Sequence, residues 1–430
     1  MNVQRLKTMD KAEYRRIMMR SYGTNDEILP RVKKTMDEIR DKGDELILEK
    51  YRERFGNDIY KSIAVTKNEI RKAYENVDAK TIRALKQMIK NITKVQKAQL
   101  PRKKEKVVSS EKGITVWREW RAIDKVGLYI PGGKATYPSS VLMTAIPALI
   151  AGCREIVVCS PPRQDGFMPA ATLVACDMLG ITKIYKVGGV EAIAAMTYGT
   201  ETIPAVYKIF GAGNSYVTAA KTIAQKLISI DMPAGPSEVF IIADETANPA
   251  FIASDLLADG EHGEDSACVL VTTSIDIAKR TIQEIVKQLV TLDTRERAEK
   301  SLSRYGLICL VDTLDEAVEF SNDYAPEHLE LMTKDADVLV SRITNAGSVF
   351  VGNWTSKSSG DYATGANHVL PTGGMAKMYP PLGVDGFGKW MQIQKCTKSG
   401  LSKIKKTIET IASIEGLPAH KESVSIRFRS

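Results

Sequence analysis

Histidine is scarce in this chain of 430 residues, which contains only four. Each one stands among glycines, carboxylates or amides and not on an evident core face, as in Glu261-His262-Gly263 and Asn367-His368. A side chain that titrates near neutral pH and is used this sparingly is better suited to chemistry than to packing. We therefore treat all four as candidate functional residues: His262, His328, His368 and His420.

Paired cysteines and long apolar runs are also missing. The six cysteines show no C-x-x-C spacing, which indicates reduced core residues and neither a disulfide scaffold nor a cysteine metal site. The longest apolar run, residues 141–152, is interrupted by Pro147 and is shorter than the roughly 20 residues that span a bilayer. Residues 1–20 are rich in charge and do not resemble a secretory signal. We expect a cytoplasmic protein without membrane partners.

Charge of one sign does not dominate any region. The net charge of +8 comes from 60 basic and 52 acidic residues that are mixed along the chain, as in residues 102–106. No DNA- or RNA-binding motif accompanies them. We interpret the basic excess as a solvated surface and expect no nucleic-acid partner.

What is present is an α/β pattern. Residues from about 26 to 100 have apolar positions at helical spacing, with a break at Gly43 and a capping box at Thr66 to Glu69. From about residue 115, strand-length apolar runs alternate with helices, which predicts parallel sheets with ligands at the carboxyl ends of the strands. The predicted strands are 126–130, 156–159, 183–187, 207–210, 239–243, 268–272, 307–311 and 348–351.

The pattern divides near Ser237 into two similar α/β modules, and the chain is long enough for two cores. The last fifty residues are amphipathic and helical, with a short strand-like stretch at 424–426. This tail is too small for a large core of its own. We expect it to pack on another surface, for which a partner subunit is a natural candidate.

A carboxylate and an imidazole stand side by side at Glu327 and His328, directly after Pro326. Glutamate can activate water and histidine can move a proton near neutral pH, so the two form a compact acid/base unit. A surface Glu-His pair is the alternative for an isolated dipeptide. The rarity of histidine in this chain favours chemistry.

Two further groups of residues give weaker indications of a functional site. Gly211-Ala212-Gly213-Asn214 stands at a predicted strand-to-helix turn that could hold a phosphate, or it is a tight turn that needs glycine. Asp259 and His262 have i, i+3 spacing, and Asp361 and His420 would add one donor of each kind. Together they would make a plausible zinc or manganese site, although spacing alone leaves exposed loop residues as the alternative.

Several motifs together resemble histidinol dehydrogenase, and they occur in the same order over essentially the whole chain. They are Val126-Gly-Leu-Tyr-Ile-Pro-Gly-Gly133, Tyr137-Pro-Ser-Ser-Val-Leu-Met143, Tyr198-Gly-Thr-Glu-Thr-Ile-Pro204, Ala234-Gly-Pro-Ser-Glu238, Glu261-His262-Gly263, Pro326-Glu327-His328-Leu329, Ala346-Gly-Ser-Val-Phe350, Gly360-Asp361-Tyr362, Asn367-His368-Val-Leu-Pro-Thr-Gly373 and Ala419-His420.

The resemblance implies an α/β fold of two Rossmann-like domains, one inserted in the other, with helical N- and C-terminal extensions. Residues 1–25 would form an N-terminal arm, and 26–128 with 237–380 the first domain, which holds the metal and acid/base residues. Residues 129–236 would form the inserted cofactor domain, and 381–430 a tail exchanged within a homodimer. It also implies a zinc enzyme that oxidises L-histidinol to L-histidine in two successive NAD-dependent steps, the last of histidine biosynthesis.

Roles follow from the resemblance by position. Glu327 and His328 would be catalytic, with His328 taking the hydroxyl proton and Glu327 activating water. The metal would be held by Asp259, His262, Asp361 and, from the partner tail, His420. Those four residues would also contact the substrate, together with Ser237, His328, His368 and Glu415. The cofactor would be faced by Tyr129, Glu191 and Asn214.

Three positions depart from the family pattern. Asp259 replaces a glutamine ligand, Ala212 replaces a proline, and Glu191 replaces a glutamine that faces the cofactor. The changes to Asp259 and Glu191 predict altered metal preference and weaker cofactor binding. They also leave two other hypotheses open: a paralogous metal- and NAD-dependent dehydrogenase acting on another small polar or sulfonated alcohol, and a catalytically silent dinucleotide-binding or scaffold protein. The intact pair of Glu327 and His328 argues against the last.

Overall fold

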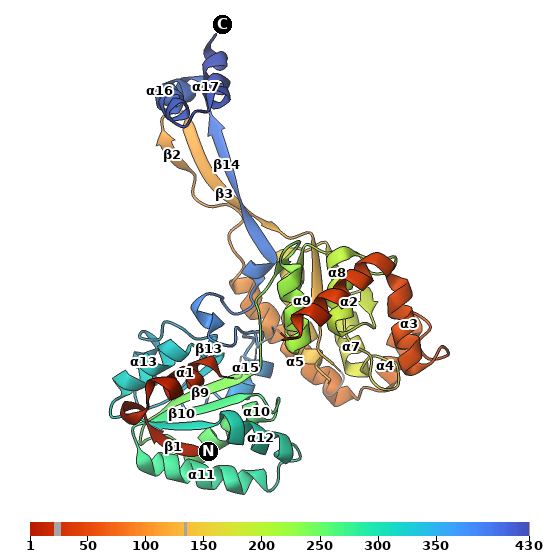
Figure 1. The fold of residues 1–430 in the computed structure, drawn as a ribbon, viewed down its shortest axis with the longest axis vertical. Coiled ribbons are helices and arrows are strands. Elements are labelled where there is room, and N and C mark those ends of the chain that lie inside the picture. The colour runs from red at the N-terminus through yellow and green to blue at the C-terminus, as the bar shows by residue number, and fades with distance from the viewer. Residues whose placement is uncertain (21–26, 133–135, 430) are drawn as a thin grey trace.

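The computed structural model describes residues 1–20, 27–132 and 136–429. Residues 21–25 of the predicted N-terminal arm and Gly133 of the predicted glycine turn lie outside these ranges. Within them the chain forms two α/β units and a stalk that projects away from both (Figure 1). No helix of the described ranges is long and apolar enough to cross a membrane.

The first unit is built on a five-stranded parallel sheet of order β6-β5-β4-β7-β8. Alternate residues of β4 face opposite sides, so Val126 and Leu128 join one core and Tyr129 joins the other. The strands are β4 (Lys125–Tyr129), β5 (Glu155–Cys159), β6 (Lys183–Tyr185), β7 (Lys208–Phe210) and β8 (Ser229–Ile230). The helices are α2 (Leu29–Lys42), α3 (Asp44–Phe55), α4 (Lys67–Glu75), α5 (Ala79–Ala98), α6 (Pro138–Ala151), α7 (Ala170–Met178), α8 (Gly189–Tyr198) and α9 (Ser215–Ala224).

Helices α2–α5 belong to a different unit from the one predicted for them. The prediction grouped residues 26–128 with residues 237–380, but α4 and α5 pack in the core on one face of the five-stranded sheet, and α2 and α3 in the core on the other. Their apolar stripes are as expected, with Gly43 between α2 and α3 and a complete capping box at Thr66. An apolar stripe shows that one face of a helix is buried, but it does not show which sheet covers that face.

The second unit is built on a six-stranded parallel sheet of order β1-β11-β10-β9-β12-β13. The strands are β1 (Asn2–Arg5), β9 (Glu238–Ala243), β10 (Ala267–Thr272), β11 (Leu307–Leu310), β12 (His328–Met332) and β13 (Ser348–Val351). Helices α10–α12 cover one face and α1, α13 and α14 the other. The helices are α1 (Lys11–Met19), α10 (Pro249–Gly260), α11 (Ile275–Leu289), α12 (Arg295–Tyr305), α13 (Leu314–Tyr324), α14 (Ala336–Val340) and α15 (Lys357–Tyr362).

The stalk is a three-stranded antiparallel sheet of β2 (Val108–Glu111), β3 (Ile114–Ala122) and β14 (Gly388–Cys396). It carries α16 (Lys398–Ile414) and α17 (Pro418–Ser425) at its far end (Figure 1). Residues 424–426, expected to be strand-like, are instead helical. The remaining short helices are η1 (Leu6–Thr8), η3 (Met375–Lys377), η4 (Val384–Phe387) and η5 (Ile426–Phe428).

Every strand predicted between residues 126 and 351 is present to within two residues at either end, and the α/β class is confirmed. The strands β1, β8 and β12 and those of the stalk were not predicted. Strand β12 was missed because its run of five residues includes the charged Glu330, which is buried in the structure. Alternation and apolarity are the signals for strands, and a buried charge weakens both.

Candidate active site

A cavity of about 990 Å³ is lined by residues of both α/β units. The first unit contributes Tyr129 and the loop of Gly213 and Asn214, at the carboxyl ends of β4 and β7. The second contributes Ser237 and Glu327, at the amino ends of β9 and β12. The expectation that ligands meet the carboxyl ends of strands therefore holds for the first unit and not for the second.

Glu327 is held by the strand beside it. Its Oε2 accepts a hydrogen bond from the backbone N–H of Glu238 at 2.8 Å and lies 3.1 Å from Ser237 Oγ. The side chain is buried, and burial raises the pKa of Glu327 to about 7. A carboxyl group that titrates near neutral pH can take and return a proton during turnover.

The adjacent His328 has a defined tautomer. Its Nδ1 lies 2.8 Å from the carbonyl oxygen of Glu238, which can only accept, so Nδ1 carries the hydrogen. Nε2 is buried, has no hydrogen-bond partner among the described residues, and lies 3.7 Å from Asp361 Oδ1. Burial alone would lower the pKa of His328, but Glu327 raises it overall. In its neutral form the ring has its lone pair on Nε2, on the side of Asp361, while Nδ1 lies 3.5 Å from Glu327 Oε2.

His262 and His368 repeat this arrangement. Nδ1 of His262 lies 3.2 Å from the carbonyl oxygen of Asp259, and Nδ1 of His368 lies 3.1 Å from that of Asp361. Both rings line the cavity, and burial lowers the pKa of each. The three central histidines are thus brought together as predicted. Each has Nε2 as its acceptor, although that of His368 is 3.4 Å from the Ser140 hydroxyl.

Lys357 was not predicted to belong to the site. It begins α15, it is 1% exposed, and its ammonium lies 3.1 Å from Asp259 Oδ1 and 3.0 Å from Asp361 Oδ2. Burial alone would lower the pKa of Lys357, but these two carboxylates raise it above its usual range, so the ammonium stays protonated. The i, i+4 spacing of Lys357 and Asp361 was the available signal, but it is also typical of exposed helix pairs.

The predicted metal ligands do not fit a metal ion. Asp259 and Asp361 each give an oxygen to the Lys357 ammonium, and Asp259 Oδ1 also accepts from the Ser237 hydroxyl at 2.9 Å. Zinc binds carboxylate oxygens at about 2.0–2.2 Å, so an ion held by both groups would lie close to the ammonium. Within the described ranges, no three histidine, cysteine or carboxylate side chains are grouped so that they could hold a metal ion.

The loop after β7 packs closely against β4 and leads into α9. Gly211 has φ +114°, and a Cβ atom there would meet the carbonyl oxygen of Tyr129 at 2.0 Å. Its N–H donates to Asp231 Oδ2 at 2.7 Å, and its carbonyl accepts from the buried Lys221 ammonium at 2.8 Å. Asn214 caps α9 by accepting from the N–H of Val217 at 3.1 Å. This fixed glycine loop at a helix amino end fits a dinucleotide phosphate.

The three departures from the family pattern have different surroundings. Ala212 lines the cavity, and Asp259 is fully buried beside it. Glu191 instead forms an ion pair with the Lys50 ammonium at 3.0 Å. The carboxylate expected to face the cofactor is therefore partly neutralised by α3, which reduces the predicted repulsion of a phosphate.

Glu415 and His420 are not brought to the cavity. Both are exposed at the far end of the stalk, where Glu415 directly follows α16 and His420 lies in α17 (Figure 1). The single chain therefore assembles Ser237, Asp259, His262, Glu327, His328, Asp361 and His368 but leaves the two tail residues apart.

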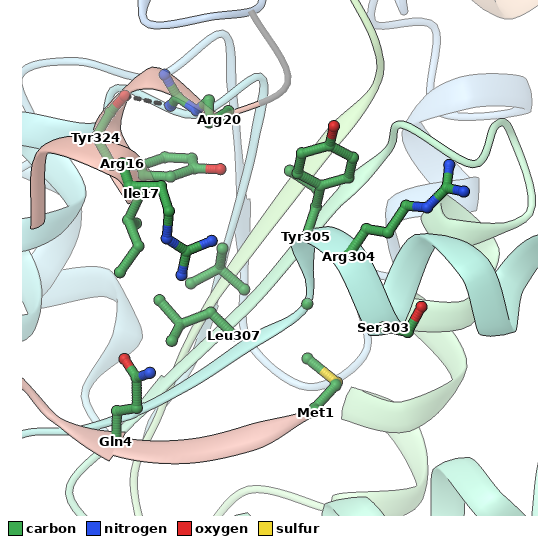
Figure 2. A pocket seen from close by; sticks show the side chains of 13 residues that line it. Met1, Gln4, Arg16, Ile17, Arg20, Ser303, Arg304, Tyr305, Leu307 and Tyr324 are labelled. Carbon is green, nitrogen blue, oxygen red and sulfur yellow. Dashed lines mark hydrogen bonds between the residues drawn. The ribbon is translucent and has the colours of Figure 1, made fainter. Parts of the chain in front are cut away.

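Arg20 was also not predicted to belong to the site, and it contacts Glu238, the neighbour of Ser237. Its Nε lies 3.3 Å from Glu238 Oε1, and both side chains are buried. Its guanidinium stacks on Tyr324, with 3.4 Å between Cζ and the ring centroid, and donates to the Tyr324 carbonyl oxygen (Figure 2). Glu238 also accepts from Gly373 N–H at 2.7 Å. A separate cavity of about 540 Å³ lies on this side and includes none of the acid/base residues.

Two parallel-sheet units with a glycine loop facing a buried acid/base pair define the class of two-domain α/β oxidoreductases. Residues 18–428 match the family model described as histidinol dehydrogenase. The chain therefore belongs to the histidinol dehydrogenase family, which confirms the resemblance carried by its motifs.

Individual relatives match this chain over nearly its full length. Histidinol dehydrogenase of Bacteroides fragilis is 46% identical over 423 residues, 98% of each chain. That of Methanocaldococcus jannaschii is 43% identical over 429 residues, covering 100% of this chain and 99% of the relative. The crystal structure of histidinol dehydrogenase from Elizabethkingia anophelis superposes with a TM-score of 0.93 at 40% identity, covering 100% of this chain and 97% of that one.

Proposed function

We propose that this protein oxidises L-histidinol to L-histidine in two successive NAD-dependent steps, in the cytoplasm, as the last step of histidine biosynthesis. The observation that carries the proposal is the position of Glu327 and His328, which face the glycine loop of the other unit across one cavity. Membership of the histidinol dehydrogenase family supports the same substrate.

The cofactor would lie along the first unit. Tyr129, Gly213 and Asn214 line the cavity at the ends of β4 and β7, and the amino end of α9 would hold a phosphate. NAD, when bound, accepts a hydride from the reacting carbon in each step. The hydrogen-bonded loop at Gly211 keeps this side of the cavity in a fixed shape. Glu191 would lie near the cofactor, and the ammonium of Lys50 offsets the negative charge of Glu191.

The protons are moved by the second unit. In the first oxidation, His328 Nε2 takes the hydroxyl proton as the carbon–hydrogen bond breaks, which leaves the aldehyde. Glu327 then takes a proton from water while the water oxygen bonds to the aldehyde carbon, and His328 returns its proton to the carbonyl oxygen, giving a hydrate. Loss of a second hydride and a hydroxyl proton to His328 yields the carboxylic acid. One water and two NAD are consumed, and two NADH and the two protons held by Glu327 and His328 are released.

Burial suits each group to its step. Glu327, with its pKa raised to about 7, is partly deprotonated at neutral pH and can act as a base toward water. His328 keeps Nε2 as a lone pair because Nδ1 donates to Glu238. Ser237, His262, Asp361 and His368 line the remaining walls and would orient the polar substrate.

The proposal includes a homodimer that exchanges its tails. Glu415 and His420, expected to contact the substrate, lie directly after α16 and on α17, and neither lines the cavity of its own chain. Apolar side chains on the stalk and tail are exposed, namely Trp390, Met391, Ile411, Ile414 and Leu417. A second copy would cover such a surface and would bring its tail to the cavity.

The first test is NADH formation from L-histidinol. We expect about two equivalents of NADH per histidinol, with histidine as the product. If a panel of amino and sulfonated alcohols yields NADH and L-histidinol does not, the substrate is a different small polar alcohol. If no alcohol is oxidised although NAD binds, the catalytic proposal is wrong.

Tail exchange can be tested by co-expressing two inactive chains. One carries Glu327→Gln and the other Glu415→Gln, with a different affinity tag on each. In an exchanged dimer one site combines an intact Glu327 with an intact tail, so the doubly purified heterodimer should recover about half of the wild-type rate. Recovery near zero would contradict exchange, and each homodimer of a variant serves as the control.

A further inference from the structure

The ammonium of Lys357 occupies the centre of the acidic part of the cavity. It is approached by Asp259 from the end of α10 and by Asp361 from the next turn of α15, at 3.1 and 3.0 Å. All three side chains are buried, with 1% of Lys357 and none of Asp259 exposed. A buried ammonium between two carboxylates is fixed in place, because leaving would strand two negative charges.

This position is the one that a divalent cation would need. A cation held by both Asp259 and Asp361 would lie between their carboxylates, where the ammonium now contacts one oxygen of each. A metal ion at bonding distance from both would touch the Lys357 nitrogen, and two positive charges at that separation repel strongly in a buried site. A protonated amine has no lone pair and cannot itself be a ligand.

We infer that the Lys357 ammonium is the resident cation of this site and that the enzyme works without a divalent metal. The inference concerns the site of the proposed function, but it depends only on Lys357 and the carboxylates around it. It also accounts for the departure at position 259. A buried carboxylate in place of a neutral side chain requires a compensating charge, and Lys357 provides it at contact distance.

The substrate would then be held by hydrogen bonds and charge and not by a Lewis acid. Asp361 lines the cavity and pairs with Lys357 through Oδ2, which leaves Oδ1 as an acceptor. An amino alcohol bound as its ammonium could donate to this oxygen, whereas a metal site would require the free amine. Lys357 lines the cavity and remains a donor for a substrate oxygen that gains negative charge.

The metal requirement is measured first on the wild-type protein. We expect mass spectrometry of protein dialysed without chelator to find far less than one zinc, manganese, iron or cobalt per chain. A strong chelator should leave both Tm and NADH formation unchanged. A stoichiometric metal, or a Tm that falls with chelator and returns with zinc, would overturn the inference.

The second measurement asks whether Lys357 blocks the site. In Lys357→Met the two carboxylates lose their cation, so we expect this variant to take up about one zinc or manganese per chain. Its Tm should rise by several degrees on adding either ion. Lys186→Met is the matched control, because Lys186 is also buried but pairs with the single carboxylate of Glu69 at 2.8 Å.

If Lys357→Met takes up no more metal than Lys186→Met, the ammonium does not occupy a position that a metal ion could take, and the inference fails. Should Lys357→Met not fold, the double variant Lys357→Met/Asp259→Asn, which removes one charge of each sign, is measured in the same way. Metal content and Tm need no substrate. An inactive protein with these metal properties would therefore contradict only the proposed function.

Discussion

Removing the guanidinium of Arg20 tests how the acid/base pair is held. In Arg20→Met the buried carboxylate of Glu238 loses its partner at 3.3 Å. Glu238 accepts the N–H of Gly373 at 2.7 Å, and its backbone carbonyl fixes the tautomer of His328. The variant should therefore be less stable, and its remaining folded fraction should turn over more slowly.

The size of the effect follows from the ion pair. Two charges 3.3 Å apart at an effective dielectric constant of roughly 20 interact with about 5 kcal/mol. Breaking buried pairs by removing one partner costs about 3–5 kcal/mol. Methionine retains part of the packing on Tyr324, so we expect a loss of about 3–4 kcal/mol in the free energy of unfolding.

The loss of stability in Arg20→Met should depend on pH. Burial raises the pKa of Glu238 even beside Arg20, so the folded state binds this proton more tightly than the unfolded state does. A raised carboxyl pKa gives stability that is complete below the unfolded value and disappears as pH rises through the folded value. Without Arg20, the deficit measured by urea unfolding should be smaller at about pH 5 than at about pH 8.

A double-mutant cycle provides the control. Arg20→Met/Glu238→Gln has no unpaired buried charge and should recover to within about 1–2 kcal/mol of the wild type. If Arg20→Met alone costs less than about 1 kcal/mol, or if the double variant is no more stable than the single one, the pair is not what holds Glu238. The reasoning from Arg20 to the active site would then be refuted.

Two further predictions concern the cavity. The rate of histidinol oxidation should rise with pH through about 7 as Glu327 loses its proton, and Glu327→Gln should lower the rate at least about a hundredfold and abolish that pH limb. A Glu327→Gln variant with the wild-type rate would favour a non-catalytic role. Gly211→Ala should weaken NAD binding about tenfold or more in calorimetry, because Cβ would clash with Tyr129. Gly152→Ala, at φ +90° but in open space, is its control; equal losses in both would contradict the clash.

The sequence by itself determined the class of fold and most of the residues of the site. Strand-length runs alternating with helices predicted parallel sheets, and the strands lie within two residues of the predictions. The neighbours Glu327 and His328 were recognisable because they are adjacent in the chain and histidine is rare. These signals are local, so no knowledge of packing was needed to read them.

Only the tertiary structure decided which sheet the helices of residues 29–98 cover and that Arg20 and Lys357 belong to the site. Lys357 reads as a surface residue in the sequence, because a lysine four residues before an aspartate is typical of an exposed helix pair. It is buried because α10 brings Asp259 to it from a hundred residues away. Charge is stabilised by its surroundings in space, so the sequence shows which charges a chain has and the fold determines which of them meet.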